Sequence, residues 1–472
     1  MNEIGIGLAG FGTVGAGVVE GLQRHADRIA ARAGVRLVLR KIADVDWERD
    51  RGVRVDPALM TRDAAALIAD PSVQIVVELI GGTKAARDLV WGALDAGKPV
   101  VTANKALLAE HGTELFTLAA QRGVALGFEA SVGGAIPIIR SIRDGLVANR
   151  FQRLIGILNG TCNFILTRMD REQATFDHAL KDAQAAGYAE ADPSLDIDGH
   201  DTAHKAVLLA GLACGVPLPF SAAHVEGIRG LSKLDIEYAR ELGYRIKLLA
   251  IVRLDDGEVE VRVHPTLIPS GSLLAAVNGV FNAILVEGDL AGPTLHYGRG
   301  AGRLPTASAV ISDLVEVARG LAGGAAPGVP FRPQAVPPPG APDWRGDHSF
   351  LHSAVVARPA WRSGAGGVCF WAASHQHRLR CAEGASFRPS RAGGLGHSSG
   401  HGSRLRGGAG GDWSAERDER PAGPDSDRRH GGGAMKRRGI KVAKFGGTSL
   451  ADANQIRKVC AIVKADPAPR PR

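Results

Sequence analysis

Apolar and polar positions along the first 130 residues follow a repeating order of short apolar-rich runs and amphipathic stretches. The runs fall at 4–9, 35–43, 73–79 and 99–103. After the first and the last run, apolar residues recur every three or four positions, the period of a helix that covers one face of a sheet. This alternation of strands and helices predicts an α/β fold with a doubly wound, parallel sheet.

The pattern changes after about residue 130. Segments 257–269 and 282–300 alternate apolar and polar side chains with the two-residue period of half-buried strands, and 303–318 returns to a helical period. Segment 156–169 indicates a strand, a turn at Asn159-Gly160 and a helix. We therefore predict one domain at 1–130 and an α+β domain at 131–325.

The periodicity disappears between about residues 326 and 434. Residues 331–434 contain no Lys, Ile, Asn, Tyr or Met and are rich in Gly, Arg, Pro and Ser. Such a segment cannot bury enough apolar surface to offset the entropy of ordering it, so we predict disorder. Lys, Ile, Asn and Tyr have AT-rich codons, and their joint absence favours GC-rich DNA read out of frame. The alternative is a native basic tail that binds acidic partners.

The charge divides at nearly the same point. Residues 1–330 hold 33 Lys and Arg against 38 Asp and Glu, a net charge of −5, and 331–472 hold 24 against 11, a net of +13. The basicity thus belongs to the tail, and we expect no nucleic-acid partner. The five cysteines show no CxxC or zinc-ligand spacing. With no signal pattern and no long apolar run, we expect a cytoplasmic protein without a membrane partner.

The first apolar run ends in a glycine-rich turn that leads into a helix. Glycines spaced as GxGxxG allow the tight turn and the close approach of a pyrophosphate to a helix N-terminus. In this context the pattern predicts a Rossmann-type domain that binds NAD or NADP, with a purely structural turn as the alternative. The six residues are Gly10, Phe11, Gly12, Thr13, Val14 and Gly15.

Two further residues are candidates for cofactor contacts. Asp44 ends the second run and is the type of carboxylate that binds the ribose of NAD, although it lies further from the glycines than usual. Arg40 and Lys41 would instead favour the 2′-phosphate of NADP, so the choice between NAD and NADP stays open. Lys105 follows the run at 99–103, at the carboxyl edge of the predicted sheet. A cation is mildly disfavoured at a helix start, which favours a role at the nicotinamide over an ordinary surface lysine.

Residues 185–205 crowd negative charge beside a single lysine. A helix is expected to end at Gly187 and another to begin near Asp201, which places Asp201 and Lys205 at i,i+4 on one face. On charge pattern alone, a solvated loop with a surface ion pair is the competing interpretation. The five carboxylates are Glu190, Asp192, Asp196, Asp198 and Asp201.

Taken together, these segments resemble the homoserine dehydrogenase family. The matching segments are GFGTVG (10–15), VTANKALLAEHG (101–112), EASVGGAIPII (129–139), GILNGTCNFILTRM (156–169), GRGAGRLPTASAVISDL (298–314) and the acidic stretch, which matches through Ala183, Gly187, Tyr188, Asp192, Pro193, Asp196, Ile197, Gly199, Asp201 and Lys205. The resemblance covers roughly residues 4–320. It implies NAD(P)-dependent interconversion of L-homoserine and L-aspartate 4-semialdehyde, in the route to threonine, methionine and isoleucine.

The resemblance gives the acidic stretch a role. The matched substrate-binding residues are Gly187, Glu190, Asp196 and Asp201, of which Asp196 would support the other acids. Lys205 matches the acid/base residue, which protonates the alkoxide formed when hydride reaches the aldehyde and takes the proton back in reverse. Lys105 matches a residue that contacts both cofactor and substrate. Which lysine is the immediate proton donor stays open.

The resemblance also implies a cation and an assembly. The segment EASVGGAIP (129–137) is expected to leave the first domain as a strand that ends in a glycine turn. In the family, the backbone around Glu129, Val132, Gly134 and Ile136 holds a monovalent cation, usually sodium, which carbonyl oxygens suit. A glycine-rich domain junction is the alternative. Gly302 is expected to touch the cofactor. The strands between 257 and 300 would form the surface on which the family dimerises, so we expect a homodimer or homotetramer.

An ordered pattern returns at Met435. The segment MKRRGIKVAKFGGTSLADANQIRKVCAIV resembles the start of an aspartate kinase, with the phosphate-binding turn KFGGTS at Lys444–Ser449. Because 435–472 is far shorter than a kinase domain, we predict no kinase activity. A reading frame that runs into a neighbouring gene would explain the fragment. The alternative to an active enzyme is a nonfunctional fusion whose aberrant tail causes aggregation.

Overall fold

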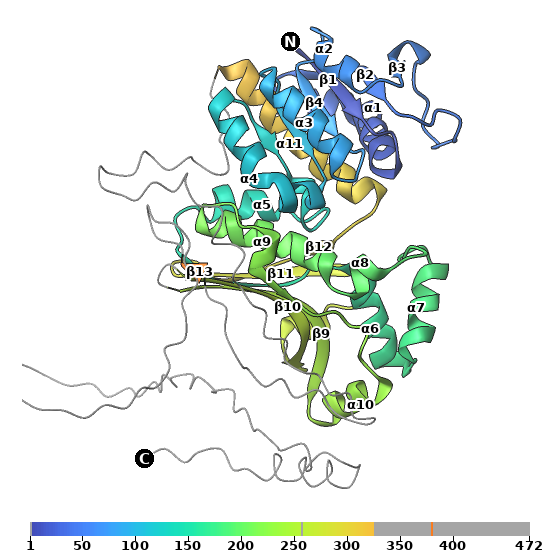
Figure 1. Cartoon of the computed structure of the whole chain (residues 1–472), viewed down its shortest axis with the longest axis vertical. Coiled ribbons are helices and arrows are strands. Elements are labelled where there is room, and N and C mark those ends of the chain that lie inside the picture. The colour runs from blue at the N-terminus through green and yellow to red at the C-terminus, as the bar shows by residue number, and fades with distance from the viewer. Residues whose placement is uncertain (1, 256–257, 325–378, 381–472) are drawn as a thin grey trace, which may run out of the picture. The chain divides into compact units, whose positions relative to one another are not determined.

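The computed structural model describes residues 2–255, 258–324 and 379–380. These residues form two sheets with helices packed on them (Figure 1). The predicted disorder at 326–434 and the kinase-like segment at 435–472 lie outside the described residues, apart from the two at 379–380. The division of the chain at residue 130 remains a prediction.

The first sheet has six parallel strands in the order β3-β2-β1-β4-β5-β6. This is the strand order of a Rossmann-type sheet, in which ligands bind beside the carboxyl ends of β1 and β4. The predicted parallel, doubly wound sheet is therefore confirmed. Its strands are β1 (Glu3–Ala9), β2 (Arg36–Ala43), β3 (Met60–Thr61), β4 (Ile75–Glu78), β5 (Val100–Thr102) and β6 (Leu126–Gly127).

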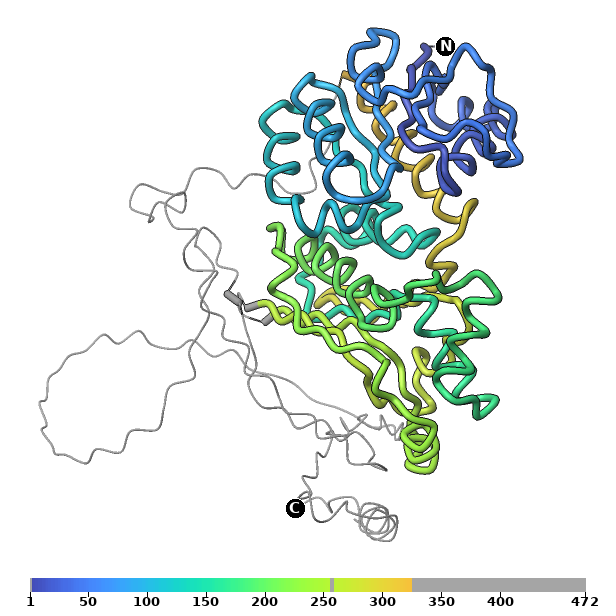
Figure 2. Tube along the Cα trace, turned by 45° about the vertical axis from the view of Figure 1, so that its right-hand side comes forward, coloured from blue at the N-terminus to red at the C-terminus, as the bar shows by residue number. Residues whose placement is uncertain are grey.

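Helices cover both faces of this sheet because its central strands are apolar on both sides. Ile6 and Val77 pack with α1 (Thr13–Ala33) on one face, while Val76 and Val100 belong to the core on the other face. The other face carries α2 (Ala65–Ala69), α3 (Lys84–Asp95) and α4 (Lys105–Arg122). The late helix α11 (Arg303–Gly323) returns to lie beside α1, as Figure 2 shows in gold.

The second sheet is mainly antiparallel, with the order β12-β11-β7-β9-β10-β13 and β8 parallel to β10. Side chains alternate between its faces: Leu248 and Ala250 pack under the helices, and Leu249 points into a smaller core on the opposite face. The strands are β7 (Phe151–Ile157), β8 (Ala223–Val225), β9 (Tyr244–Asp255), β10 (Glu258–Pro269), β11 (Phe281–Gly288), β12 (Gly292–Arg299) and β13 (Leu379–Arg380).

The helices of the second sheet carry most of the predicted substrate residues. They are α6 (Gly160–Glu172), α7 (Phe176–Ala185), α8 (Ser194–Ile197), α9 (His200–Cys214) and α10 (Lys233–Glu241), preceded by the short α5 (Ile138–Arg140).

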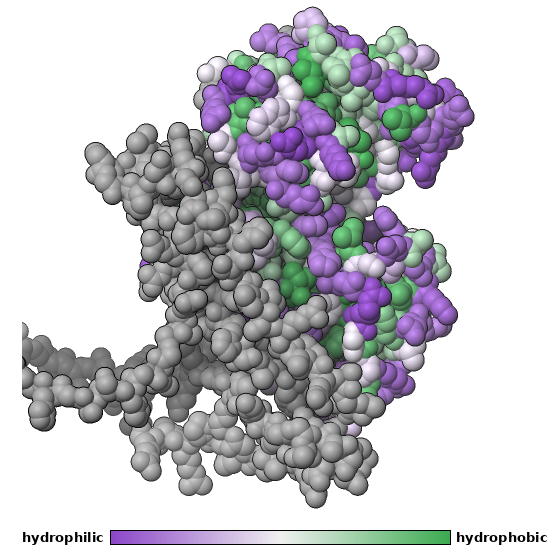
Figure 3. Space-filling view, in the orientation of Figure 1, coloured by the Kyte–Doolittle hydropathy of each residue, from purple (hydrophilic) through white to green (hydrophobic). Residues whose placement is uncertain are grey.

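Hydrophilic residues predominate on the visible face of the described residues (Figure 3). Within the described part of the chain, none of the helices has the length and hydropathy of a membrane span.

One local prediction is wrong. The segment that begins at Glu129 was expected to leave the first domain as a strand, but Glu129–Ser131 is a single 3₁₀ turn. The backbone N–H of Glu129 donates to Asp313 Oδ2 at 2.8 Å, so it is not available to a neighbouring strand. Gly133 and Gly134 then adopt left-handed φ angles of 75° and 57°, which redirect the chain.

Candidate active site

Strand β7 leads directly to the residues that the sequence predicts to bind the substrate. After Ile157 the chain passes through Leu158 to Asn159, whose side chain caps α6 by accepting from Cys162 N at 2.8 Å. This confirms the predicted strand, turn and helix. The thiol of Cys162 is buried and donates to the Asp196 carbonyl at 3.1 Å. Burial raises the pKa of Cys162 well above its usual value, so this thiol is a packing group rather than a nucleophile.

Asp201 lies between two lysines. Lys205 Nζ donates to Asp201 Oδ2 at 2.7 Å, which confirms the predicted i,i+4 pair on α9. Lys105, the first residue of α4, places its Nζ 3.1 Å from Asp201 Oδ1. Asp201 and Lys205 are only 6% and 9% exposed. The competing picture of a solvated surface pair is therefore wrong.

The two lysines set the charge of Asp201. Burial alone would raise the pKa of this carboxyl, but Lys205, Lys105 and the hydrogen bond from Asn159 outweigh burial and hold the pKa well below its usual value. Asp201 in turn raises the pKa of Lys105, against the opposing effect of burial. The cluster is thus a buried carboxylate held between two lysines, of which Lys105 has a raised pKa.

Lys205 has a further contact that fixes its direction. Its Nζ donates to the Leu158 carbonyl at 2.8 Å as well as to Asp201. An ammonium has three donors, so among the described residues these two acceptors leave one N–H of Lys205 for a ligand. The lysine is therefore held in place while keeping a proton to give.

A second carboxylate lies next to Asp201. Asp196, on α8, accepts from Asn159 Nδ2 at 2.7 Å. Burial raises the pKa of Asp196, and the charge of Asp201 raises it further. Asn159 therefore touches both acids, because its Nδ2 also donates to Asp201 Oδ2 at 2.8 Å.

Glu190 and Gly187 lie on the exposed turn that follows α7. The helix ends at Ala185, two residues before the predicted Gly187, which has a left-handed φ of 72°. The backbone of this turn is held by Gln184, whose Nε2 donates to the Glu190 carbonyl at 3.1 Å. Thr161 Oγ1 donates to the Tyr188 carbonyl at 2.6 Å and ties the turn to α6. The Glu190 side chain is exposed, unlike Asp201.

The predicted glycine turn connects β1 to α1. Gly10 has a φ of 94°, and a Cβ there would lie 2.4 Å from the Leu79 carbonyl oxygen. A Cβ on Gly15 would lie 2.0 Å from the Gly10 oxygen. A Cβ on Gly12, the N-cap of α1, would meet nothing within 4 Å. Two of the glycines are thus required by packing, and Gly12 faces open space at a helix N-terminus.

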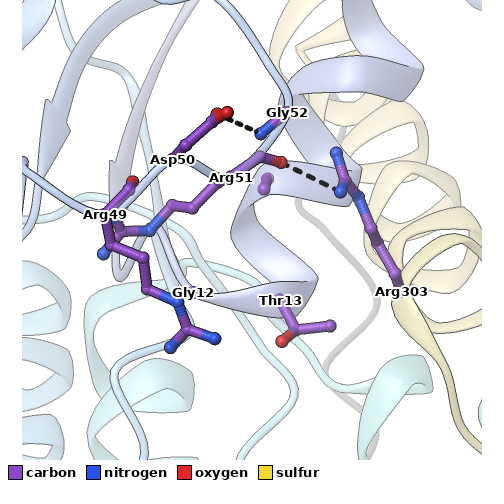
Figure 4. A pocket seen from close by; sticks show the side chains of 8 residues that line it. Gly12, Thr13, Arg49, Asp50, Arg51, Gly52 and Arg303 are labelled. Atoms are coloured by element: carbon purple, nitrogen blue, oxygen red, sulfur yellow. Dashed lines mark hydrogen bonds between the residues drawn. The ribbon is translucent and has the colours of Figure 1, made fainter.

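Gly12 borders a pocket of about 330 Å³ that is rich in arginine (Figure 4). Three arginines line it, Arg49, Arg51 and Arg303, of which Arg51 pairs with Asp44 and Arg303 with Glu20. Arg303 Nη1 donates to the Arg51 carbonyl at 3.0 Å, which joins the start of α11 to the loop after β2. These three arginines were not predicted from the sequence. The remaining lining residues are Thr13, Ala16, Asp50 and Gly52.

Asp44 is held by the turn itself. Its carboxylate accepts from Phe11 N at 2.5 Å and Asp46 N at 2.8 Å, and Arg51 lies 3.4 Å away. The nearby cations considered from the sequence are paired elsewhere: Arg40 with Glu3 at 2.7 Å and Lys41 with Asp70 at 2.8 Å. Asp44 therefore positions the glycine turn, and the cations of the pocket come from other segments.

The junction proposed for a cation holds a pair of buried carboxyls. Glu129 accepts from the N–H groups of Ile139 and Arg140 at 2.8 and 2.9 Å. Burial raises the pKa of Glu129, and burial with the neighbouring Glu129 raises the pKa of Asp313 to about 8. Val132 and Ile136 are buried here, and a Cβ on Gly134 would lie 2.5 Å from the Gly300 oxygen. The described residues contain no cluster of three or more His, Cys, Asp or Glu suited to a metal.

Gly302 stands where α11 begins. It has a φ of 123°, and its carbonyl accepts from Thr306 N at 3.0 Å. The next residue is Arg303, which lines the arginine pocket. Gly302 is therefore placed close to the predicted cofactor region, although it is not itself a lining residue of that pocket.

Two family models match the chain. The model described as homoserine dehydrogenase, NAD binding domain, matches residues 10–129, and the model described as homoserine dehydrogenase matches residues 137–315. The chain belongs to the homoserine dehydrogenase family.

Individual homoserine dehydrogenases agree with this assignment. The enzyme of Neisseria gonorrhoeae is 49% identical over 319 residues, which cover 68% of this chain and 73% of the relative. The crystal structure of the Thiobacillus denitrificans enzyme is 48% identical, with a TM-score of 0.67, over 70% of this chain and 78% of that one. A hyperthermophilic archaeal homoserine dehydrogenase in complex with NADPH is 28% identical, with a TM-score of 0.57, over 67% and 97% of the two chains.

The homoserine dehydrogenase assignment confirms the oxidoreductase predicted from the sequence, with its nicotinamide-nucleotide domain and small-molecule substrate. The alternative of a nonfunctional fusion gains no support. The roles of the individual site residues are proposals, developed next from the geometry.

Proposed function

We propose that the cluster of Asp201, Lys205 and Lys105 carries out the interconversion of L-homoserine and L-aspartate 4-semialdehyde. The observation that supports this most directly is the contact of Lys105 with Asp201, since it joins the start of α4, beside β5 of the first sheet, to α9 on the second. A substrate at Asp201 would thus lie where the two layers of the fold meet. That is where a hydride donor and acceptor must be brought together.

Lys205 is the proposed acid and base. When homoserine is oxidised, its C4–O–H loses a proton while C4 loses hydride, and a bound nicotinamide would accept that hydride. The N–H of Lys205 that is left free by Leu158 and Asp201 is placed to exchange the hydroxyl proton. Lys105 keeps its proton because its pKa is raised, so it acts as a fixed positive charge toward the developing alkoxide.

Glu190 is proposed to bind the ammonium group of homoserine. Asp201 already accepts from Lys205 and Asn159 and lies beside Lys105, so its oxygens are engaged. Glu190 is the exposed carboxylate of the same region and contributes to the raised pKa of Lys105, after the larger effects of Asp201 and burial. Gly187 on the same turn would offer a backbone contact, and Asp196 would support Asp201 through Asn159.

The arginine pocket favours NADP over NAD. Arg49, Arg51 and Arg303 surround a pocket next to Gly12, and guanidinium groups bind phosphate oxygens in a bidentate geometry. The archaeal relative was solved with NADPH, which supports the same choice. We assign the glycine turn to the pyrophosphate, Lys105 and Gly302 to the nicotinamide half, and the three arginines to the 2′-phosphate.

A monovalent cation at the chain junction fits the residues present. Glu129 and Asp313 are buried carboxyls: burial raises the pKa of each, Arg140 opposes this only in part, and further positive charge would favour the ionised forms. A cation held by backbone oxygens of Glu129, Val132, Gly134 and Ile136 would supply that charge. We expect the midpoint of thermal unfolding to rise in sodium chloride relative to choline chloride at equal ionic strength. Equal midpoints would count against the cation.

The far face of the second sheet is proposed as the dimer surface. Leu285 and Leu295 are only partly buried there, and Tyr297 is 56% exposed and stacks on Phe281 at 5.1 Å. We expect a homodimer or homotetramer in the cytoplasm. Leu295→Arg should shift the sedimentation coefficient toward that of a monomer, and an unchanged value would exclude this face.

The substrate assignment is tested with a matched alcohol. L-Homoserine and 4-hydroxybutyrate present the same terminal hydroxyl, but the second lacks the ammonium group. We expect NADPH formation with homoserine and little with 4-hydroxybutyrate at the same concentration. Equal rates would contradict recognition of the ammonium, and absence of a rate with homoserine would contradict the proposed function.

A further inference from the structure

Asn159 is the neutral residue at the centre of the charged cluster. It is 5% exposed, and its amide makes three hydrogen bonds. Oδ1 accepts from Cys162 N at 2.8 Å, and Nδ2 donates to Asp196 Oδ1 at 2.7 Å and to Asp201 Oδ2 at 2.8 Å. Both N–H groups of the amide are thus given to carboxylates.

An N-cap alone does not require asparagine. Asp, Ser and Thr cap helices about as well, because a cap needs only an oxygen that accepts from the first turn. Only an amide combines that acceptor with two N–H donors on a neighbouring atom. The residue type at 159 therefore matches the pair of carboxylates more closely than it matches the cap.

The two carboxylates need such a donor. Asp201 is buried and Asp196 is partly buried, and the charge of Asp201 raises the pKa of Asp196. Two buried anions at close range repel, and one of them takes up a proton unless nearby donors stabilise both. Asn159 stabilises both without adding a charge that would compete with the lysines.

We propose that Asn159 is a positioning residue that keeps Asp196 and Asp201 ionised together and holds Asp201 against Lys205. This inference rests on the proposed function, since it concerns the same site. Asp201 Oδ2 accepts from both Asn159 and Lys205, so the amide fixes the oxygen that directs the lysine. Asn159 acts through Asp201 and does not itself contact the reacting atoms.

The protonation of this pair depends on every charged group around it. If Asn159 is replaced by aspartate, the cap oxygen remains, but both N–H donors are lost and a third carboxylate is added. The three carboxyl groups at 159, 196 and 201 would then share one proton at neutral pH that the wild type does not hold. The other titratable groups that interact with the cluster are Lys105, Lys205, Glu190, Asp198, Cys162 and His204.

The test compares Asn159→Asp with the same substitution at Asn149. Asn149 lies just before β7, at the strand end opposite to Asn159, and its Oδ1 accepts from Leu290 N and Ala291 N while its Nδ2 donates to Leu146 O. Asn149→Asp therefore repeats the added charge and the lost donor away from the acids. Asn159→Ser keeps a cap oxygen and a single donor, and we expect it to lie between wild type and Asn159→Asp.

We expect Asn159→Asp to lower kcat/KM for homoserine about 100-fold, the size of a lost hydrogen bond to charged groups, and to leave NADPH binding intact. The acid limb of the pH profile of kcat/KM should move up by about one pH unit or more, because the carboxylates must lose a proton that the wild type does not hold. Asn149→Asp should change neither quantity.

Two results would overturn the proposal. One is an Asn159→Asp variant whose pH profile and kcat/KM match those of the wild type. The other is a loss of thermal stability in Asn159→Asp and Asn159→Ser with no shift of the acid limb, which would mean a cap and nothing more. Calorimetric binding of homoserine across the same pH range gives the same answer for a protein without turnover. A wild-type protein without turnover would therefore contradict the proposed function. The pH dependence of homoserine binding would still test the role of Asn159.

Discussion

The proposed substrate end, around Asp201, and the proposed cofactor end, around Gly12, hold charge in different ways. At the substrate end, Asp201 and Lys205 are buried and each charge already has protein partners. At the cofactor end, three arginines and one aspartate line an open pocket beside Gly12. The charges of Asp201 and Lys205 are buried against each other, whereas the arginines of the second region border a pocket that an anion could enter, with Arg51 and Arg303 also paired with Asp44 and Glu20.

This difference follows from the tasks of the two regions. Proton exchange requires a lysine held in one direction, and the contacts of Lys205 with Leu158 and Asp201 provide that. Binding of a phosphate requires donors that can reach the ligand from several sides, which Arg49, Arg51 and Arg303 do from a loop and from the start of α11. A substitution at one end should therefore leave the function of the other end unchanged.

The largest effect is expected at Lys205. Lys205→Met keeps an unbranched side chain of similar bulk and removes the amine that exchanges a proton with the substrate, so kcat should fall about 10³-fold. Binding of NADPH, followed by fluorescence, should persist. Lys233→Met, in an exposed pair with Glu237 on α10, is the matched control and should retain full activity. Appreciable turnover in Lys205→Met would remove Lys205 from the acid/base role.

The next effect is on stability. Asp201→Asn leaves the buried Lys205 without its carboxylate and should lower the free energy of unfolding by about 3 kcal/mol at neutral pH. The folded-state pKa of Asp201 lies below its ordinary value of 3.8, so its stabilisation is complete above about pH 4 and is lost as the pH falls further. Urea unfolding should thus give a difference in the free energy of unfolding between wild type and variant that is constant from pH 7 to 5 and smaller below pH 4. A difference in unfolding free energy that grows as the pH falls would contradict stabilisation by the ionised Asp201.

Glu190 gives a smaller effect of another kind. Glu190→Gln removes the charge that binds the ammonium of homoserine but keeps the shape, so KM for homoserine should rise roughly 10-fold to 100-fold with kcat nearly unchanged. Steady-state kinetics with varied homoserine measures the two constants separately. An unchanged KM would show that another carboxylate binds the ammonium.

The smallest effect is expected in the arginine pocket. Arg49→Ala removes one phosphate donor and should raise KM for NADP+ about 10-fold while KM for NAD+ stays the same. Arg122→Ala, in an exposed ion pair with Asp95 at the end of α4, is the control and should change neither KM. Equal changes for both cofactors would mean that Arg49 does not contact the 2′-phosphate.

The substrate end could be predicted from the sequence to a large extent. Asp201 and Lys205 lie at i,i+4 on one helix, so their spacing fixes their mutual position, and Asp196 precedes them on the short helix α8. What the spacing could not give was their burial. That depends on packing of α9 against the second sheet and α4, which involves residues far apart in the chain.

The cofactor end was harder to predict. Arg40 and Lys41 were considered because they precede Asp44 directly, but on β2 their side chains reach Glu3 and Asp70. The arginines that do line the pocket come from the loop after β2 and from α11, some 250 residues later, as Arg51 and Arg303 show. Neither the hydrophobic periodicity nor the spacing of residues indicates that arginines so far apart in the chain line the same pocket. The strand expected at Glu129 failed for a related reason, since its N–H is bound by Asp313 on α11.

In this homoserine dehydrogenase, the acid/base step at Lys205 and the choice of cofactor at the arginine pocket are expected to be independent of each other. The most direct test is kcat/KM with NADP+ and with NAD+, at saturating homoserine, for wild type, Lys205→Met and Arg49→Ala. Lys205→Met should lower both values by the same factor, whereas Arg49→Ala should lower the NADP+ value alone. A Lys205→Met variant with an altered NADP+ to NAD+ ratio, or an Arg49→Ala variant with an unchanged one, would contradict this independence.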